Sequence, residues 1–551
     1  MKIYIKNIER YVDFTGGETL AAIHDRLGLD LGFEPICARV NNKSESLAYA
    51  VFAPKQVEYL PRWSASGRRV YVRSLCMMLY RAVDLCSPGA RLNICHSVEG
   101  GYFCRVTGVE VDDGYIRDLL QAMRRLVDRD IPFERRERLT ADVKEIFRRQ
   151  GLTDKVRLLD TIHDLYTVYY SLDGLCDSYY GPLAPSTRAV RHFDLRPRHD
   201  GFLLLGFDPV NHDIPAQPVT QEKMFRAFSD YVHFNDIVGV KNVGELNRAT
   251  LDGRANDLIN VAEALHDKKI AGIADEITRR YRLGGARVVL IAGPSSSGKT
   301  TFTKRLAIYL MTNLLRPKMI SLDDYFVDRH LTPLDETGDY DYESLHALDL
   351  ELFNQHLRQL IAGETVELPT YNFELGTRQY RGRSLRLEDN SILLIEGIHG
   401  LNPELTATVS DDMKYRVYVS AFTTLAIDDH NWVPTTDNRL LRRIIRDHKY
   451  RGTSPLETIR RWPSVRRGEE RWIFPYQENA DSTFNSSLIF ELGVMKTYGE
   501  ELLRNFPRDI PEYAEAYRLN KFLSYFVPIS EHDVPPTSLM REFLGGSSFR
   551  Y

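Results

Sequence analysis

The chain has 551 residues, of which 43% are hydrophobic and 27% charged, a composition that excludes disordered, collagen-like and coiled-coil proteins for most of its length. Its 72 basic and 76 acidic residues leave a net charge of −4, which gives no global case for binding nucleic acid or an anionic membrane. No run of about 18 apolar residues occurs, and the first residues lack the apolar core of a secretory signal, so we expect no membrane partner.

The six cysteines all lie in the first third of the chain, and no two of them form a Cys-x-x-Cys pair. We therefore expect neither a disulfide framework nor a zinc site. Scattered reduced thiols are typical of a cytoplasmic protein. The cysteines are Cys37, Cys76, Cys86, Cys95, Cys104 and Cys176.

The first 60 residues predict a small β-rich domain. Short alternating runs, separated by turn residues, surround one apolar patch with helical spacing. The runs lie at 2–8, 36–40 and 47–52, the helical patch at 20–27, and the turns at Gly16-Gly17 and Asn41-Asn42. We expect strands wrapped on a single helix over residues 1–60.

Helical spacing dominates the next part of the chain. Apolar residues recur at three- and four-residue steps over 75–83 and again over 119–126, which predicts helices within an α+β domain at 61–210. The pattern weakens near 216–241 and then returns over 256–283 as one face of a long amphipathic helix. Residues 211–285 are therefore predicted to be a helical linker.

The period changes again from residue 287. Short apolar runs without polar alternation are separated by helical segments, which is typical of parallel strands buried on both faces. The runs lie at 288–292, 319–322, 392–395 and 417–419. This predicts an α/β domain with a parallel sheet over residues 286–500, followed by a helical extension over 501–551.

A phosphate-binding loop follows the first of these strands. The sequence Gly293-Pro-Ser-Ser-Ser-Gly298-Lys299-Thr300 matches G-x-x-x-x-G-K-[ST] and precedes a helical pattern, which is the context that the motif requires. Its backbone N–H groups and the helix N-terminus would bind phosphates, Lys299 would reach the β- and γ-phosphates, and the Thr300 hydroxyl would bind Mg²⁺. We expect ATP to contact Gly293, Pro294, Ser295, Ser296, Ser297, Gly298, Lys299, Thr300 and Thr301.

Acidic residues follow two other predicted strands. Asp323 and Asp324 come directly after the strand at 319–322, and ligands of open α/β sheets bind at the carboxyl ends of the strands. A carboxylate there can accept the proton of a hydroxyl nucleophile. Glu396 ends the strand at 392–395 and fits a magnesium-side role, because Mg²⁺ takes only one or two protein carboxylates.

A basic segment lies between Arg439 and Arg471, with 11 lysines and arginines against 4 aspartates and glutamates. Arginines that close over a triphosphate offset charge in the transition state, and this is the interpretation that the phosphate-binding loop favours. A solvated helix face is the structural alternative. A nucleic-acid surface interleaved with Trp432, Trp462 and Trp472 is the other.

These motifs, in this order, resemble the uridine kinase and phosphoribulokinase family over roughly residues 286–491. The resemblance rests on the phosphate-binding loop, Ser321-Leu-Asp-Asp-Tyr-Phe326, Leu368-Pro-Thr-Tyr-Asn-Phe373, Ile395-Glu-Gly397 and Arg442-Arg-Ile-Ile-Arg-Asp447 with Arg451-Gly452. It implies an ATP- and Mg²⁺-dependent kinase in which Asp323 is the catalytic base. It also implies that Arg443 and Arg446 are catalytic residues of a lid, and that Arg451 contacts the nucleotide.

The same resemblance implies a substrate site. Glu343 falls where the family has a ribose-binding aspartate, Tyr371 and Phe373 would flank a nucleobase, and Arg378 would assist from the same loop. Gly376 stands where uridine kinases have a base-contacting histidine. Loss of that polar contact is expected to relax discrimination between bases.

The first 205 residues resemble the N-terminal region of threonyl-tRNA synthetases, with a β-grasp domain and an editing-type domain. That editing domain deacylates mischarged tRNA with three histidines and a cysteine. Here His96 alone is kept, whereas Gly100, Tyr179 and Leu183 occupy the other positions. One such residue cannot bind a metal or assemble the proton-transfer groups, so we expect an inactive scaffold in which His96 is structural.

Three functions follow as hypotheses. The first is a kinase that uses ATP and Mg²⁺ to phosphorylate the 5′-hydroxyl of a ribonucleoside, uridine or cytidine first. The second is a kinase for another sugar-like hydroxyl or an unusual nucleoside, and the third is an RNA-associated P-loop protein. A nucleic-acid partner is disfavoured by the net charge of −4, a homo-oligomer stays open, and no motif distinguishes ATP from GTP as the donor.

Overall fold

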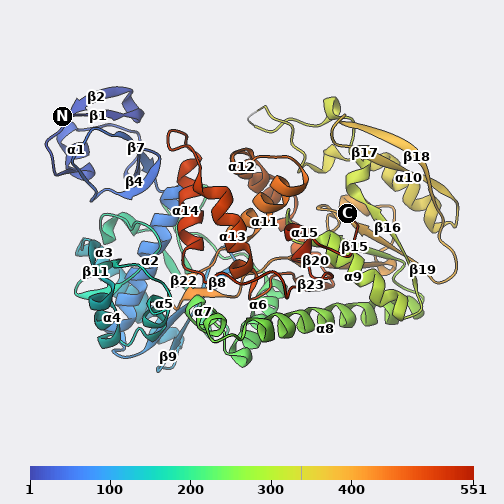
Figure 1. The fold of residues 1–551 in the computed structure, drawn as a ribbon, viewed down its shortest axis with the longest axis horizontal. Helices are drawn as coiled ribbons and strands as arrows, with labels where there is room; N and C mark the ends of the chain where they lie inside the picture. Colours follow the sequence, from blue (N-terminus) through green and yellow to red (C-terminus); the bar gives the residue numbers. More distant parts are fainter. Residues whose placement is uncertain (337, 551) are drawn as a thin grey trace.

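The computed structural model describes residues 1–336 and 338–550. The first 61 residues form a five-stranded sheet, in the order β2-β1-β7-β4-β5, around helix α1 (Figure 1). Thr19 caps α1 by accepting the Ala22 N–H at 3.2 Å, and the helix buries Leu20 and Ile23 against the sheet. The elements are β1 (Lys2–Ile5), β2 (Arg10–Asp13), β3 (Glu18–Thr19), α1 (Leu20–Leu27), β4 (Pro35–Val40), β5 (Lys43–Ser46), β6 (Ala50–Val51) and β7 (Gln56–Pro61).

The predicted strand at 47–52 is mostly wrong, because only Ala50–Val51 is extended. The pairing strand of the hairpin is instead the polar segment Lys43–Ser46, which lies antiparallel to β4. The predicted helix at 20–27 matches α1, and the synthetase-like β-grasp identity of this unit stays a prediction.

A second unit is built around α2 (Ala65–Cys86), a helix buried along most of its length. It packs against a sheet in the order β13-β14-β9-β8, while β10-β11-β12 form a smaller sheet. The predicted helix at 119–126 lies within α3. The other elements are β8 (Arg91–Val98), β9 (Gly101–Thr107), α3 (Asp113–Asp128), β10 (Glu134–Leu139), α4 (Thr140–Arg149), α5 (Thr153–Leu159), β11 (Tyr166–Leu172), β12 (Leu175–Asp177), β13 (Asp194–Arg198) and β14 (Gly201–Leu205).

Three helices connect this unit to the C-terminal half: α6 (Glu222–Val238), α7 (Val243–Leu251) and α8 (Ala255–Arg282). Helix α8 matches the long amphipathic helix predicted for 256–283, and it packs on α9 (Lys299–Thr312) of the following domain (Figure 1). The helical character predicted for this connecting part is therefore confirmed. The exact domain boundaries stay a prediction.

A five-stranded parallel sheet forms the core of the C-terminal half, in the order β16-β19-β15-β20-β23. Its central strand β15 is fully buried, as continuous apolar runs predict. The final strand β23 was not predicted, because its sequence Ser-Thr-Phe-Asn carries little apolar signal. The strands are β15 (Val288–Ala292), β16 (Arg316–Ser321), β19 (Ser391–Glu396), β20 (Lys414–Ser420) and β23 (Ser482–Asn485).

The same half of the chain contains two helices and two hairpins in addition to this sheet. Helix α9 (Lys299–Thr312) follows the phosphate-binding loop, and α10 (Leu350–Ile361) packs against the hairpin of β17 (Val366–Asn372) and β18 (Thr377–Leu385). The short pair β21 (Ala426–Asp428) and β22 (Asn431–Trp432) contacts the N-terminal half.

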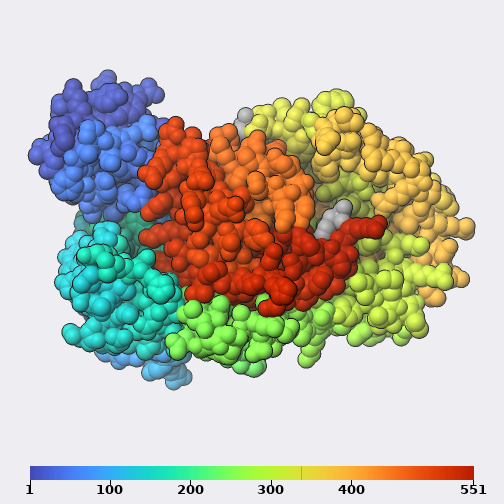
Figure 2. All heavy atoms as spheres, in the orientation of Figure 1, coloured from blue at the N-terminus to red at the C-terminus, as the bar shows by residue number. Residues whose placement is uncertain are grey.

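The C-terminal helices lie between the N-terminal half and the parallel sheet (Figures 1 and 2). Arg69 of α2 pairs with Glu515 of α14 at 3.0 Å, whereas Glu542 of α15 reaches the start of α9. The helices are α11 (Thr435–Tyr450), α12 (Pro455–Trp472), α13 (Glu491–Arg504), α14 (Tyr513–Leu523) and α15 (Arg541–Leu544). Within residues 1–336 and 338–550, no helix combines the length and apolarity needed to cross a bilayer.

A buried ion network also joins the two halves. Lys155 of α5 lies 2.8 Å from both Asp177 and Asp428, and His430 shares Asp177 at 2.8 Å. Burying such charges is costly unless they are paired with good geometry. The two halves are therefore fixed to each other by charge pairing as well as by apolar packing.

Candidate functional site

The phosphate-binding loop connects β15 to α9, as its sequence predicts. Ser296 has a φ of 58° and Gly298 a φ of 81°, and these left-handed residues fold the loop back on itself. At Gly293 a Cβ atom would lie 1.9 Å from the Val419 carbonyl oxygen, so only glycine allows the loop to approach β20. Residues 293–300 thus form a compact loop at the N-terminus of α9, a geometry that attracts anions.

Lys299 lies inside this loop and donates to the Pro294 carbonyl at 3.1 Å. Burial lowers the pKa of Lys299, and four surrounding carboxylates oppose that shift. They belong to Glu396, Asp323, Glu542 and Glu343. The ammonium group therefore stands at the centre of a ring of acids, where it can bind phosphate oxygens.

Strand pairing explains why two of these acids meet the loop. Glu396 ends β19, which pairs with β15 on one side and with β16 on the other, opposite Ser321. Asp323 is exposed in the single 3-10 turn that directly follows β16, and its N–H donates to the Ser321 hydroxyl at 3.3 Å. The predicted base and the predicted metal-side acid are thus brought to the same edge of the sheet.

Thr300 and Glu396 form the pair that would bind Mg²⁺. The Thr300 hydroxyl donates to Glu396 Oε1 at 3.2 Å, and burial raises the pKa of Glu396 to about 7. A hydroxyl and one carboxylate are hard oxygen ligands of the kind that Mg²⁺ takes, with phosphates and water completing its shell. The residues present therefore fit the ion.

Glu343 lies between the loop and α12. Its side chain packs against Gly468, where an added Cβ would lie 2.3 Å from Glu343 Cβ, so a larger residue would push it away. Its Oε2 is buried and has no hydrogen-bond partner among the described residues. Burial raises the pKa of Glu343 to about 7, with the charge of Glu469 adding to the shift and Arg443 opposing it.

The predicted arginine segment folds into α11 and α12. Arg443 Nη1 donates to the Ser295 hydroxyl at 2.8 Å, so this arginine touches the phosphate-binding loop. Arg446 instead pairs with the adjacent Asp447 at 2.8 Å, and the half-exposed Arg451 lies 3.7 Å from the same carboxylate. Of the three predicted arginines, Arg443 therefore contacts the loop directly.

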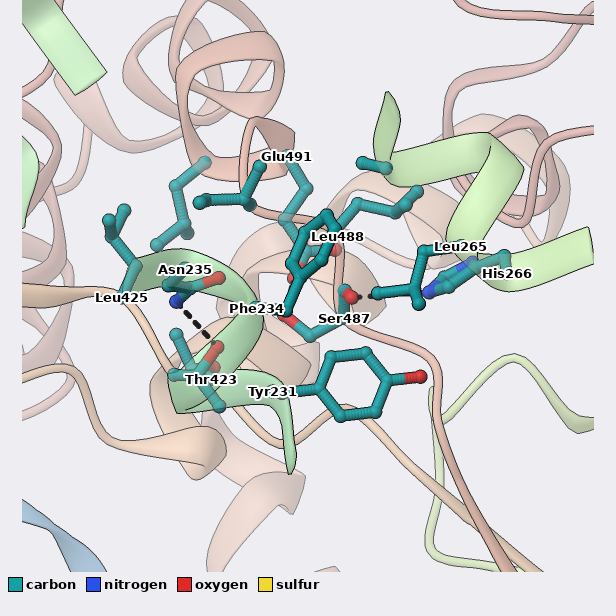
Figure 3. A pocket seen from close by; sticks show the side chains of 14 residues that line it. Tyr231, Phe234, Asn235, Leu265, His266, Thr423, Leu425, Ser487, Leu488 and Glu491 are labelled. Atoms are coloured by element: carbon teal, nitrogen blue, oxygen red, sulfur yellow. Dashed lines mark hydrogen bonds between the residues drawn. The ribbon is translucent and has the colours of Figure 1, made fainter. Parts of the chain in front are cut away.

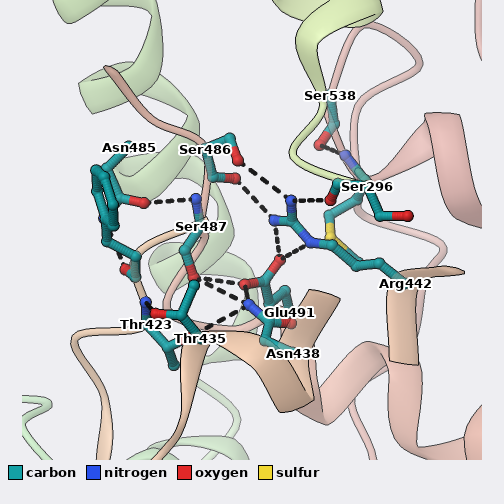
Figure 4. Close-up of polar contacts among 12 residues, drawn as sticks. Ser296, Thr423, Thr435, Asn438, Arg442, Asn485, Ser486, Ser487, Glu491 and Ser538 are labelled. Carbon is teal, nitrogen blue, oxygen red and sulfur yellow. Dashed lines mark hydrogen bonds and ion pairs between the residues drawn. The ribbon is translucent and has the colours of Figure 1, made fainter. Parts of the chain in front are cut away.

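Two further arginines of α11 also reach the loop, although the sequence analysis gave neither of them an individual role. Arg439 Nε donates to the Ser295 carbonyl at 2.9 Å and pairs with Glu469. Arg442 donates to the Ser296 carbonyl at 3.5 Å and pairs with Glu491 (Figure 4). The spacing of 439, 442, 443 and 446 by three and four residues places them on one face of a helix, which was a usable signal.

Two acids hold the loop from outside the predicted motifs. Glu469 of α12 accepts the Ser295 N–H at 3.1 Å. Glu542 of α15 accepts from the N–H and the hydroxyl of Thr301, at 3.3 and 2.6 Å. Neither position carries a sequence signal, because each acid reaches the site only through the packing of the C-terminal helices.

The hairpin of β17 and β18 carries the predicted nucleobase residues. Tyr371 is buried and Phe373 is 57% exposed, and their rings lie 5.1 Å apart at 74°. Arg378 pairs with Asp349 at 2.8 Å. Its predicted contact with substrate stays a prediction.

Gly376 has a structural reason to be glycine. It has a φ of 68°, and a Cβ atom there would lie 2.7 Å from Arg329 Nε. The Arg329 guanidinium donates to the Phe373 carbonyl. The position expected to lack a polar group is therefore packed against a cation that sequence reasoning did not anticipate.

Trp462, one of the three tryptophans in or near the basic segment, is not free to stack on a base. Trp462 is 8% exposed and belongs to the helical core, where Arg439 lies over its ring at 5.4 Å. His96 is likewise internal: it is stacked on Phe228 with ring centroids 4.1 Å apart, and burial lowers its pKa to about 3. In residues 1–336 and 338–550 no cluster of three metal-binding side chains is found, near His96 or elsewhere.

One small pocket lies between α6, α8 and the segments 423–425 and 487–492 (Figure 3). Its lining is mostly apolar and includes Tyr231, Leu265 and Leu488, and Asn235 at its edge donates to Thr424 at 3.0 Å. It is separated from the phosphate-binding loop, none of whose residues line it. We therefore assign the chemistry to the loop and not to this pocket.

Comparisons with known proteins match this same part of the chain. The model of the phosphoribulokinase/uridine kinase family matches residues 288–488. A uridine kinase of Bacillus pumilus is 32% identical over 195 residues, covering 35% of this chain and 83% of that protein. A uridine kinase of Staphylococcus aureus is 31% identical over 196 residues, covering 35% of this chain and 84% of that protein.

A solved structure described as a possible uridine kinase from Bacillus stearothermophilus is 21% identical, covers 36% of this chain and 89% of that one, and superposes with a TM-score of 0.26. That score is too low to bear on the assignment. The sequence matches, together with the loop, Asp323 and Glu396 at one sheet edge, describe an ATP-dependent phosphotransferase that acts on a hydroxyl group. The chain belongs to the phosphoribulokinase/uridine kinase family.

Proposed function

We propose that the chain phosphorylates the 5′-hydroxyl of a ribonucleoside with ATP and Mg²⁺, and that uridine and cytidine are its preferred substrates. The observation that carries this proposal is the buried Glu343 carboxylate, which lies near the charges of Arg443 and Lys299. Its Oε2 has no hydrogen-bond partner among the described residues. A buried acceptor of this kind is costly unless a ligand donates to it. Ribose offers a pair of hydroxyl donors of the right type.

The proposed chemistry follows from the placement of the charges. Asp323 accepts the proton of the 5′-hydroxyl while the hydroxyl oxygen attacks the γ-phosphorus. The β–γ bridging oxygen leaves with ADP. Lys299 and Arg443 offset the negative charge that builds on the transferred phosphoryl group. Mg²⁺, held by Thr300 and Glu396, would neutralise charge on the β- and γ-phosphates when it is bound.

The ring pair supports a nucleobase next to the ribose. Tyr371 and Phe373 lie at the turn of the hairpin with their rings 5.1 Å apart, Phe373 being the exposed ring, and stacking tolerates any base. Uridine kinases among the relatives make a pyrimidine the first choice.

A second candidate is a kinase for a different sugar-like hydroxyl compound, and Arg329 favours it. Its guanidinium packs on Gly376 next to Phe373, where a cation would suit an acidic group on the substrate. A sugar acid would satisfy that cation better than a neutral pyrimidine.

An ADP-release assay over a panel of acceptors separates these functions. The panel contains uridine, cytidine, adenosine, inosine and gluconate, each with and without bulk tRNA. Turnover with pyrimidine ribosides supports the proposal, and turnover with gluconate alone supports the second candidate. ADP release that requires tRNA would favour the RNA-associated alternative. Cytoplasmic location stays a prediction, and the oligomeric state and the choice between ATP and GTP stay open.

A further inference from the structure

A second cleft lies at the other end of the molecule, between the N-terminal sheet and the C-terminal helices. It encloses a volume of about 110 Å³, and it is lined by β5, α2, the segment 179–182 and α14. No residue of the phosphate-binding loop contributes to it, and α2 and α14 lie far from α9 (Figure 1).

The lining of this cleft is strongly cationic. Six basic side chains face it against the single acid Glu45. They come from four separate segments of the chain. The fold therefore brings them together, since they are not neighbours in the sequence. The basic residues are Lys43, Arg69, Arg73, Arg135, Arg518 and Lys521.

Four of these cations have carboxylate partners. Lys43 pairs with Glu45 at 2.8 Å, and Arg69 pairs with Glu515 at 3.0 Å. Arg518 pairs with Asp437 and Glu515, and Arg135 pairs with Glu137 at 3.4 Å. These pairs explain how so many cations are held together, but they leave two without a counter-charge.

Arg73 and Lys521 are those two, since no carboxylate of the described residues lies within ion-pair distance of either. Arg73 is 6% exposed, and its charge is met only by the Pro182 carbonyl at 3.1 Å and the Tyr180 ring at 5.1 Å. At Gly181 a Cβ atom would lie 2.0 Å from Arg73 Nη1, so glycine there makes room for the guanidinium. Burial lowers the pKa of Lys521, and the charges of Lys43 and Arg73 lower it further.

This arrangement is unfavourable for a purely structural cluster. A buried cation without a counter-ion is unfavourable, because it has lost water and gained no opposite charge in return. A bound anion with two or more negative charges would satisfy both cations at once. Phosphate groups suit arginine best, because guanidinium binds them in a bidentate manner.

We propose that this cleft is a second binding site, for a small phosphorylated ligand. Arg73 and Lys521 are its central contacts, and Lys43 and Arg135 are its rim. Four tyrosines also line the cleft. A nucleotide and a simple polyphosphate are the two sources of this phosphate chemistry. The site does not depend on the substrate of the kinase domain.

Calorimetric titration of the full chain with inorganic pyrophosphate and with uridine 5′-monophosphate tests the proposal. Each titration is run on the wild type, on Lys299→Ala, and on the double variant Arg135→Gln/Lys521→Gln. The double variant changes partly exposed side chains, so the fold is expected to persist, and thermal unfolding checks this. Lys268→Gln, an exposed cation on α8, is the matched control.

We expect at least one probe to bind in Lys299→Ala with the wild-type affinity for this cleft. The double variant should bind it roughly tenfold more weakly or worse, the effect of losing charge-assisted hydrogen bonds, and Lys268→Gln should not change it. Tighter binding of the nucleotide than of pyrophosphate identifies a nucleotide site, and the reverse identifies a polyphosphate site. If neither probe binds, or if the double variant and Lys268→Gln behave alike, the proposal is wrong. An RNA oligonucleotide that binds this cleft when both small probes fail would also contradict it.

Discussion

The hydroxyl of Thr300 donates a hydrogen bond to Glu396 Oε1 at 3.2 Å, and this contact joins the end of the phosphate-binding loop to the end of the neighbouring strand β19. It exists because β15 and β19 are parallel neighbours, so that both strands finish at the same edge of the sheet. The acids of the site and the lysine of the loop meet at this edge. The predictions below test what each of these groups does there.

Replacing Asp323 by asparagine should slow the chemical step and leave ATP binding intact. Loss of a general base typically lowers kcat by about 10²–10⁴-fold. The phosphates are held by the loop and by Lys299, so the affinity for ATP should change little. Steady-state kinetics with ATP-binding calorimetry measures both. A variant that loses ATP binding but keeps kcat would instead make Asp323 a metal-side residue.

The pH dependence of kcat/KM for the acceptor should follow the ionisation of Glu343. Its pKa is raised to about 7, so its carboxylate is mostly protonated at pH 6 and ionised at pH 8. If the ionised form binds the acceptor hydroxyls, kcat/KM for the acceptor should rise across this interval, by about tenfold from one pH unit below the pKa. Saturating Mg²⁺ and ATP keep Glu396 ionised during the measurement. In Glu343→Gln the rise of kcat/KM with pH should disappear. If the variant keeps the same pH profile, the rise is caused by the ionisation of another group.

Removing the charge of Glu542 should strengthen ATP binding. Its carboxylate accepts from the N–H and hydroxyl of Thr301 at the start of α9, where the phosphates of ATP are expected. Two like charges a few Å apart repel each other by up to about 1 kcal/mol even at the dielectric of water, so Glu542→Gln should lower the Kd for ATP by about two- to fivefold. Asp533→Asn, an exposed change in the same C-terminal segment, is the control. Weaker ATP binding in Glu542→Gln would mean that Glu542 supports the loop.

Glu469→Ala should destabilise the protein strongly. Glu469 is fully buried and pairs with Arg439, which is 1% exposed. Removing one partner of a buried pair typically costs about 3–5 kcal/mol, because the other charge is left unpaired. Glu470→Ala next to it removes only a surface ion pair with Arg466 and should cost below about 1 kcal/mol. Urea unfolding of both variants gives the comparison, and equal losses would contradict this assignment.

Much of the site could be predicted because its groups follow local rules. The loop residues and Asp323 directly follow strands and Glu396 ends one, and the neighbouring positions of β16, β19 and β15 in the sheet place them together. The helices at 20–27 and 256–283 could also be predicted from the sequence, because each buries one continuous apolar stripe.

The remainder depends on long-range packing. Glu469, Glu491 and Glu542 contact the loop region or its arginines only because α12, α13 and α15 fold back on it. Strands β5 and β23 are polar, so hydrophobic alternation could not reveal them. The same holds for Arg329, whose position opposite Gly376 depends on the fold of the β17–β18 hairpin.

The central claim is that this chain transfers the γ-phosphate of ATP to a nucleoside hydroxyl through its phosphate-binding loop. The most direct measurement uses γ-labelled ATP with uridine and cytidine, and compares the wild type with Lys299→Ala. The account predicts labelled nucleoside 5′-monophosphate with the wild type and none above background with Lys299→Ala, whose fold should be preserved by circular dichroism. Near wild-type transfer by the folded Lys299→Ala variant would contradict it, as would wild-type consumption of ATP without any labelled nucleoside.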